Sequence, residues 1–337
     1  MKYREAYTDT ASYKQDYLSG LEALIAKRQR DAEDQRNAYV RDIFLDSERY
    51  RGELRRMLGY PLSDEMEREV PTVTMEKLSD EDFYSVYRMR YEVTDGLIMT
   101  GLFFRIAGEE KRPLVIVQHG GEGTPEAISG VYGFTSNYND MLMRVIRNGV
   151  HAFCPQLLLW KTEKYGVPYD RNDIDERLKS AGSSIAAVEL YGIMRALDYF
   201  ESLSEIEGFG MVGLSYGGFY TQFMTALDVR IRAAISCAYF NKREVCHYPD
   251  WTWFASLRKF DDAELACLVY PRKLYLEVGK SDPLFGYESA EAAFARLRML
   301  CADIGTEWVE FIPFDGVHEF CPDDEPIKKL IADIKKV

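Results

Sequence analysis

The stretch Gly213-Leu214-Ser215-Tyr216-Gly217-Gly218 is the most informative part of this 337-residue sequence. It follows a short apolar run at 209–212, which predicts a buried strand, and it precedes a helical pattern that begins near Phe219. A serine between glycines at such a junction predicts a sharp turn with strained backbone angles, because side chains two positions to either side would collide with the neighbouring strand and helix. The turn places the serine hydroxyl at the positive end of a helix, where developing negative charge is favoured.

Strands and helices alternate on both sides of this turn. Upstream, alternating segments at 73–75, 84–93 and 98–104 predict successive strands, and Thr94-Asp95-Gly96 joins the last two as a hairpin. A continuous apolar run at 114–117 is typical of a parallel strand buried on both faces. Further strands are expected at 150–154, 233–236, 274–278 and 308–312, and helices at 138–147, 183–200 and 290–301. The pattern predicts the α/β class, with a mostly parallel central sheet flanked by helices.

The N-terminal region has a different pattern. Apolar residues recur at helical spacing from Leu18 to Leu58, and Gly59-Tyr60-Pro61 ends that pattern. We therefore expect a helical N-terminal extension at 1–69, ahead of one larger domain at 70–337. A helical cap packed on the larger domain is the expected role of the extension. A dimerisation arm, which would make the protein a homo-oligomer through its N-terminal helices, and a wall of the substrate site are the alternatives.

Composition and charge limit the kinds of partner. The net charge of −13 argues against a nucleic-acid partner, which normally meets a basic face. No apolar run approaches the roughly 18 residues that span a bilayer, and the first residues contain no apolar signal core. We expect no membrane association and a cytoplasmic location. The six cysteines are scattered without metal-ligand or C-x-x-C spacing, so we expect them to be buried free thiols. We expect no metal and no other cofactor.

A serine hydroxyl needs an adjacent base to act as a nucleophile at neutral pH. Of the four histidines, His318 directly follows the last expected strand and is the candidate base, with a histidine of a surface loop as the alternative. Asp282 follows the strand at 274–278 and would orient the imidazole and stabilise its protonated form. Asp315 is the competing acid, but it lies so close to His318 in sequence that its geometry looks worse. The expected catalytic set is therefore Ser215, Asp282 and His318.

A glycine-rich loop at 119–123 follows the buried strand at 114–117. Its glycines allow backbone N–H groups to approach a substrate oxygen, and Gly121 is the expected donor. The N–H of Tyr216, directly after the serine, is the expected second donor of this oxyanion hole. His119 is expected to make structural hydrogen bonds rather than to act as a second base.

From about residue 95 onward, the chain resembles the α/β-hydrolase superfamily, in particular the branch of dienelactone hydrolases, acetyl xylan esterases and prolyl oligopeptidase catalytic domains. The residues that carry the resemblance are His119-Gly120-Gly121, 213–218, 279–283 and 316–319. It implies the α/β-hydrolase fold and a serine hydrolase with an acyl-enzyme mechanism. Prolyl oligopeptidases carry a β-propeller ahead of this domain, and the helical extension is far too short for one, which argues against a peptidase. The extension is more similar to that of bacterial esterases of the acetyl xylan esterase type.

Two expected insertions, 157–179 and 241–270, carry clustered aromatic residues. Trp160, Trp251 and Trp253 are candidate substrate-binding residues, because aromatic rings in loops over a site stack on sugar faces or wall an apolar pocket. Packing of these rings into the core of the insertion itself is the alternative. The expected function is hydrolysis of a small-molecule ester with a short acyl group such as acetyl, and the resemblance suggests carbohydrate esters. A peptidase or amidase, and a non-catalytic binding protein on the same scaffold, are the alternatives.

Overall fold

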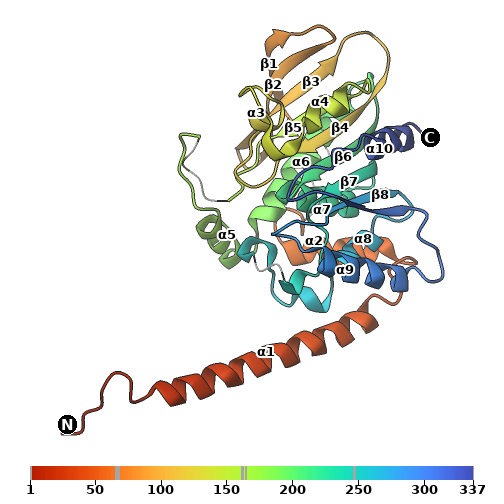
Figure 1. Ribbon diagram of the computed structural model, residues 1–337. Helices are drawn as coiled ribbons and strands as arrows, with labels where there is room; N and C mark the ends of the chain where they lie inside the picture. Colours follow the sequence, from red (N-terminus) through yellow and green to blue (C-terminus); the bar gives the residue numbers. More distant parts are fainter. Residues whose placement is uncertain (1, 65–68, 161–162, 164, 246–247, 337) are drawn as a thin grey trace.

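The computed structural model describes residues 2–64, 69–160, 163, 165–245 and 248–336 (Figure 1). Nine strands within these residues form one sheet, in the order β1-β2-β3-β5-β4-β6-β7-β8-β9. They are β1 (Val73–Asp80), β2 (Tyr84–Thr94), β3 (Leu97–Ile106), β4 (Arg112–Gln118), β5 (His151–Pro155), β6 (Ile206–Leu214), β7 (Ile231–Cys237), β8 (Lys273–Gly279) and β9 (Val309–Phe314). The β1–β2, β2–β3 and β3–β5 pairs are antiparallel and all the other pairs are parallel. This confirms the predicted fold class, an antiparallel start followed by a mostly parallel sheet.

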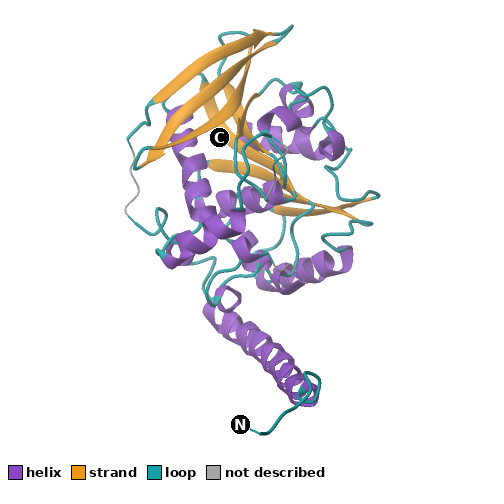
Figure 2. Cartoon of the chain, turned by 90° about the vertical axis from the view of Figure 1, so that its left-hand side faces the viewer, coloured by secondary structure: helices purple, strands orange, loops and turns teal. Residues whose placement is uncertain are grey.

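Helices cover both faces of the sheet (Figures 1 and 2). They are α1 (Ala11–Tyr39), α2 (Ser47–Leu58), α3 (Pro125–Ile128), α4 (Met141–Ile146), α5 (Arg171–Ser180), α6 (Ile185–Glu201), α7 (Tyr216–Leu227), α8 (Asp262–Cys267), α9 (Tyr287–Leu300) and α10 (Glu325–Lys335). Leu114 and Ile116 of β4 belong to the apolar core that includes α2, α6, α7, α8 and α9. Val115 and Val117 point the other way, into the core that includes α3, α4 and α10. The continuous apolar run at 114–117 is therefore buried on both faces, as expected for a parallel strand.

The helices differ from the sequence-based expectation in their bounds and in their number. The helix expected at 138–147 is reduced to α4, which a short 3-10 turn at 136–138 precedes, and α7 begins at Tyr216 rather than near Phe219. The short helices α3, α5 and α8 and the longer α10 were not expected. In α10 the apolar residues do recur at helical spacing, and four of them are buried: Ile327, Leu330, Ile331 and Ile334.

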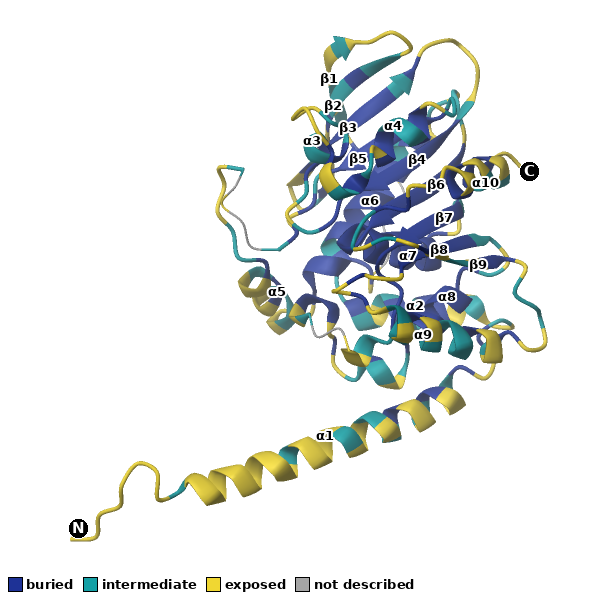
Figure 3. Ribbon diagram, in the orientation of Figure 1, coloured by how far each residue is buried: buried dark blue, intermediate teal, exposed yellow. Residues whose placement is uncertain are grey.

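The two long N-terminal helices lie in different surroundings. The α2 helix packs on the main body through buried residues that include Tyr50 and Leu54, and its Arg51 donates hydrogen bonds to the carbonyl oxygens of Ala226 and Leu268 at 3.0 Å. This helix therefore packs on the main body, and the division of the chain into an extension at 1–69 and a larger domain stays a prediction. The α1 helix projects away from the body and is exposed along most of its length (Figure 3). No helix in the described part of the chain is long and apolar enough to cross a membrane.

Both expected insertions contain short helical segments. The first includes most of α5, and the second includes α8 and three short 3-10 turns, at Arg243–Val245, Pro249–Trp251 and Ser256–Arg258. Residues 161, 162, 164, 246 and 247 of these insertions lie outside the described residues. The five described cysteines are buried and free, as expected, whereas Cys246 is not among the described residues.

Candidate active site

The candidate site lies at the carboxyl ends of β4 and β6, which are neighbours in the sheet. The chain leaves β4 for β5 on one side and later leaves β6 for β7 on the other, so the direction of strand addition changes between β4 and β6. Ligands of open α/β sheets bind at such a switch point, because the loops separate there and leave a crevice. The glycine-rich loop at 119–123 follows β4, and Ser215 follows β6.

Ser215 has the strained backbone that the flanking glycines predict. Its φ of 61° and ψ of −120° lie outside the favoured regions for a residue with a side chain. A Cβ atom on Gly213 would collide with the carbonyl oxygen of Gly217, and a Cβ atom on Gly217 would collide with that of Gln118 in β4. The Ser215 N–H donates to the carbonyl oxygen of Cys237 at 2.9 Å, which holds the turn against β7. The turn therefore depends on both glycines.

His318 and Asp282 are joined by a hydrogen bond of 2.8 Å between Nδ1 and Oδ2. The other carboxylate oxygen, Oδ1, accepts the N–H groups of Leu284 and Phe285 at 2.8 and 3.1 Å, so the carboxylate is fixed from two sides. The Phe285 ring stacks on the imidazole, with centroids 5.6 Å apart. Because an ionised carboxylate only accepts hydrogen bonds, Nδ1 carries the proton and Nε2 is left as the base.

Two residues weighed for catalytic roles have other partners. Asp315, the competing acid, is 91% exposed and forms an ion pair with Lys280 at 2.8 Å, away from the imidazole. His119 is buried, its Nδ1 contacts the carbonyl oxygen of Gly120 at 3.0 Å, and its Nε2 accepts the N–H of Leu157 at 3.1 Å. Burial lowers the pKa of His119 to about 4, so its ring is neutral at pH 7. Its contacts are those of a structural residue.

Two side chains hold the loop that carries His318, and one of them, Cys237, also contacts the serine turn. The Cys237 thiol donates to the carbonyl oxygen of Glu319 at 3.3 Å, and the carbonyl oxygen of Cys237 accepts the Ser215 N–H. The Asn137 amide donates to the carbonyl oxygen of His318 at 3.0 Å. In the described part of the chain, no hydrogen bond joins the Ser215 hydroxyl to His318. The loops of all three predicted triad residues therefore meet at one edge of the sheet, and one of the two triad hydrogen bonds is formed.

The two expected oxyanion donors lie on the loops after β4 and β6. The N–H of Gly120 donates to the Tyr138 hydroxyl at 2.9 Å. The N–H groups of Gly121 and Tyr216 have no acceptor among the described residues, as expected of groups that await a substrate oxygen. Trp160 packs against both loops. A Cβ atom on Gly121 would lie 2.8 Å from the Trp160 ring. The same ring meets the Tyr216 ring edge-on, with centroids 6.0 Å apart. Trp160 therefore lies beside both expected donors.

The other two candidate tryptophans are buried in an aromatic cluster. Trp251 is 4% exposed, stacks on Phe219 of α7 at 5.0 Å and contacts the Tyr216 ring at 4.6 Å. Trp253 is 6% exposed and packs on Phe219 and Phe223 at 6.4 and 5.8 Å. This placement favours the alternative in which the insertion packs its rings into its own core. Trp251 reaches the site indirectly, through Tyr216 and through Phe285, whose ring lies 6.2 Å from its own. A role of either ring in substrate binding stays a prediction.

A buried charged network beneath Tyr216 was not anticipated from the sequence. The Arg171 guanidinium donates to Asp250 at 2.6 Å, to Glu189 at 2.9 Å and to the Tyr220 hydroxyl at 2.8 Å. The Tyr216 hydroxyl donates to the second oxygen of Asp250 at 3.2 Å, and burial raises the pKa of this phenol, so it keeps its proton. Sequence offers no signal for this network, because its ion pairs join residues 18 and 79 positions apart.

A pocket of about 680 Å³ opens beside Gly121, one of the two expected oxyanion donors. This volume is within the range of small-molecule sites. The rings of Tyr132 and Tyr165 stack at its wall, with centroids 6.0 Å apart, and Gly121, Glu122 and Asn137 also line it. No group of three or more metal-ligating side chains occurs among the residues that the structure describes.

Comparison with known proteins identifies similar solved structures. No protein-family model and no curated protein matches this chain. An acetyl xylan esterase candidate from Bacteroides fragilis is 13% identical, with a TM-score of 0.66 over 88% of this chain and 84% of that one. A glucuronoyl esterase from Solibacter usitatus is 13% identical (TM-score 0.59; 84% and 90% of the two chains). An acetyl xylan esterase from Paenibacillus sp. R4 is 18% identical (TM-score 0.56; 86% and 94%). At such identities the likeness shows the fold that these proteins share with this chain.

Proposed function

We propose that this chain, which has the α/β-hydrolase fold, is a serine-dependent carboxylic-ester hydrolase acting on short-chain acyl esters. The observation that carries the proposal is the 2.8 Å hydrogen bond from His318 to Asp282 at the sheet edge where the strained Ser215 turn lies. A nucleophile, a base and an acid that orients the base are the parts that acyl transfer requires. The two unpaired N–H groups of Gly121 and Tyr216 add an oxyanion hole.

The proposed reaction has two steps. In the first, His318 takes the proton of Ser215 while the serine oxygen attacks the ester carbonyl carbon, and the imidazole then protonates the leaving alcohol. Asp282 stabilises the imidazolium, and the N–H groups of Gly121 and Tyr216 hold the oxyanion. In the second step, water activated by His318 releases the acid. Loss of one oxyanion donor would cost roughly 2.7–4 kcal/mol of transition-state stabilisation.

The missing hydrogen bond between Ser215 and His318 is compatible with this mechanism. Catalytic hydrogen bonds are often long or poorly aligned in a free enzyme and tighten when substrate binds. The His318 loop is held by Asn137 and by the Cys237 thiol, which keeps the proposed base at the edge of the sheet where Ser215 lies.

Carbohydrate esters are the proposed substrate class, with acetyl as the proposed acyl group. The stacked pair of Tyr132 and Tyr165 offers the flat apolar surface that sugar rings favour, and Asn137 and Glu122 offer hydrogen-bonding groups for hydroxyls. Trp160 packs beside both oxyanion donors and leaves little room there, which favours a short acyl group. The similar acetyl xylan and glucuronoyl esterases are named for esters of carbohydrates.

Hydrolysis of p-nitrophenyl acetate, butyrate and octanoate by the wild type and by Ser215→Ala tests the proposal. We expect the acetate to be hydrolysed fastest, and Ser215→Ala to lose at least about a thousandfold in kcat, because triad members act as a unit. Ser202→Ala, at an exposed serine, is the control and should match the wild type. Full activity of Ser215→Ala would overturn the serine mechanism. If the folded wild type hydrolyses none of the three, a peptidase or a binding scaffold becomes the better assignment.

Acetate release from acetylated xylo-oligosaccharides tests the substrate class separately. We expect the wild type to release acetate and Ser215→Ala to release none. Hydrolysis of the aryl acetate without any release from the sugars would leave the esterase assignment standing and overturn the carbohydrate one.

A further inference from the structure

The α1 helix stands largely free of the rest of the molecule. It runs from Ala11 to Tyr39, projects away from the body, and is exposed along most of its length (Figures 1 and 3). Its buried residues, Ala32 and Arg36, lie near its C-terminal end, where Arg36 forms an ion pair with Glu264 at 3.2 Å. The N-terminal part of the helix therefore has little tertiary packing to stabilise it.

Local features do not compensate for the missing packing. The helix has no side-chain hydrogen bond at its N-cap and no acidic residue in its first turn. Gly20 lies in its middle, which costs about 1 kcal/mol relative to alanine. Because most helices in proteins owe their stability to the packing of an apolar face, this segment has little to stabilise it on its own.

One face of α1 carries an apolar stripe. Leu21 lies at its centre, and the other apolar residues lie three or four positions from it: Tyr17, Leu18, Leu24 and Ile25. The exposed fractions of Tyr17, Leu18, Leu24 and Ile25 are 71%, 51%, 52% and 48%. These side chains are what a partner would cover.

The apolar positions of the stripe are symmetric about Leu21, although the residues at the outer pair differ. Leu18 and Leu24 lie three residues to either side of it, and Tyr17 and Ile25 lie four residues to either side. A twofold dimer requires a surface that is complementary to its own rotated copy. We propose that α1 pairs antiparallel with α1 of a second copy of this chain, about a twofold axis at Leu21.

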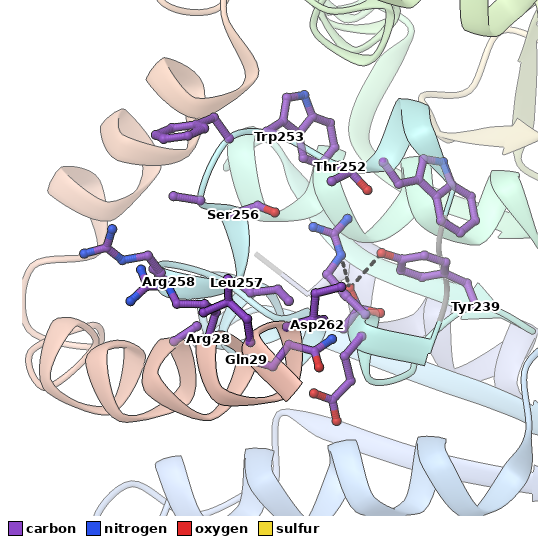
Figure 4. Close-up of a pocket in the computed structure, with 17 residues that line it drawn as sticks. Arg28, Gln29, Tyr239, Thr252, Trp253, Ser256, Leu257, Arg258 and Asp262 are labelled. Carbon is purple, nitrogen blue, oxygen red and sulfur yellow. Dashed lines mark hydrogen bonds and ion pairs between the residues drawn. The ribbon is translucent and has the colours of Figure 1, made fainter. Parts of the chain in front are cut away.

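A cleft of about 540 Å³ lies where α1 leaves the body (Figure 4). Leu24 and Gln29 line its α1 side, and the segment 251–258, with Trp253 and Phe254, lines the opposite side. The Phe254 ring is 100% exposed. An exposed large ring at the mouth of an apolar cleft is typical of an interaction surface.

The proposed pairing brings aromatic side chains of the second copy to this cleft. In an antiparallel arrangement about Leu21, Tyr17 of the second copy lies level with Ile25, and Tyr13 lies level with Gln29. Ile25 and Gln29 both line the cleft, so the two tyrosines approach Phe254. The cleft and the stripe then form one continuous interface, and the symmetry repeats it on the other side of the axis.

The area is sufficient for a stable dimer. A fully buried aromatic side chain removes about 150–250 Å² from water, and Tyr13, Tyr17 and Phe254 are 73%, 71% and 100% exposed. Together with the aliphatic residues of the stripe, these side chains would bury roughly 600 Å² of accessible surface per subunit, or about 1,200 Å² in total. This total is at the lower end of the range for stable interfaces.

Charged residues at the ends of the stripe follow the same symmetry. Lys14 and Arg28 lie seven residues to either side of Leu21, so Lys14 of one copy is level with Arg28 of the other. Asp31 forms an ion pair with Arg28 at 3.4 Å and offsets the two positive charges at that level. The repulsion between the two positive side chains at each end of the interface is therefore partly offset.

The mass of the full chain in solution tests the proposal. Sedimentation equilibrium of the wild type at micromolar concentrations should give twice the chain mass of 38.9 kDa. Leu21→Glu places two carboxylates against each other on the axis and should give the monomer. The control, Ala23→Glu, adds the same charge on the opposite face of α1 and should remain dimeric. A monomeric wild type, a dimeric Leu21→Glu, or a monomeric Ala23→Glu would each overturn the proposal.

Cross-linking tests the antiparallel geometry and does not depend on the proposed function. Leu21→Cys lies on the axis and should cross-link to itself with a short bis-maleimide, above the wild-type background. Lys14→Cys should not cross-link alone but should do so when mixed with Arg28→Cys. Self-cross-linking of Lys14→Cys, or no cross-link at Leu21→Cys, would contradict the antiparallel pair.

Discussion

At the scale of single residues, two nearby aspartates have opposite surroundings. The Asp282 side chain is 0% exposed and accepts three hydrogen bonds, from the imidazole and from two backbone N–H groups. Asp315, three residues before His318, is 91% exposed and pairs only with Lys280. An exposed ion pair contributes little to the stability of the protein. A buried carboxylate that accepts a hydrogen bond from an imidazole determines which ring nitrogen carries the proton.

Replacing these carboxylates one at a time should separate their roles. Asp282→Asn preserves the shape of the side chain but stabilises the wrong imidazole tautomer, so we expect kcat on p-nitrophenyl acetate to fall on the order of 10⁴-fold. Asp315→Asn is the matched control and should leave kcat nearly unchanged. An equal loss in both variants would show that Asp282 has no special role.

At the scale of elements, Arg171 joins segments that are distant in sequence. It begins α5 and forms ion pairs with Glu189 of α6 and with Asp250, which precedes Trp251 in the second insertion. It also donates to Tyr220 of α7, the helix that begins with the expected oxyanion donor Tyr216. The two insertions are thereby anchored to the helix that follows the serine turn.

Removing this guanidinium should destabilise the protein strongly. Arg171→Met leaves two buried carboxylates without their cation, which typically costs about 3–5 kcal/mol. Arg177→Met, also in α5, removes an exposed pair with Asp173 and should cost less than about 1 kcal/mol. Urea denaturation gives both free energies of unfolding. A loss below about 1 kcal/mol for Arg171→Met would contradict the view that the network holds the insertions in place.

At the scale of the whole molecule, the central sheet contains an ionisable group that its burial keeps neutral. Glu277 lies in β8, is 0% exposed, and burial raises its pKa from 4.5 to about 8. Between these two values, the folded protein retains a proton that the unfolded chain has lost. The free energy of unfolding contributed by this group therefore falls as pH rises from about 4.5 to about 8, and it levels off above that.

Glu277→Gln should remove this dependence, because the amide resembles the neutral acid in shape and does not titrate. Near pH 4.5 the variant and the wild type should be similarly stable, and at pH 8 the variant should be more stable by up to a few kcal/mol. Urea denaturation at both pH values measures this, with the exposed Glu76→Gln as a control that should show no such difference. A variant that is less stable than the wild type at pH 8 would contradict the assignment.

Features that depend on local chain geometry could be predicted from the sequence. The glycines around Ser215 indicate a strained turn, because only residues without a Cβ atom fit at those positions. The apolar runs indicate the strands, and the strand ends indicate which side chains gather at one edge of the sheet. Ser215, Asp282 and His318 each lie just after a strand of the parallel part of the sheet, and the resemblance to α/β-hydrolases implies their roles.

Features that depend on contacts between distant segments could be seen only in the folded structure. It placed Asp282 rather than Asp315 against His318, 36 residues away, and it assembled the network around Arg171. It also buried Trp251 and Trp253 and directed α1 away from the body. The periodicity of a sequence shows that a face is apolar but not which surface covers it, because that depends on how all the elements pack together.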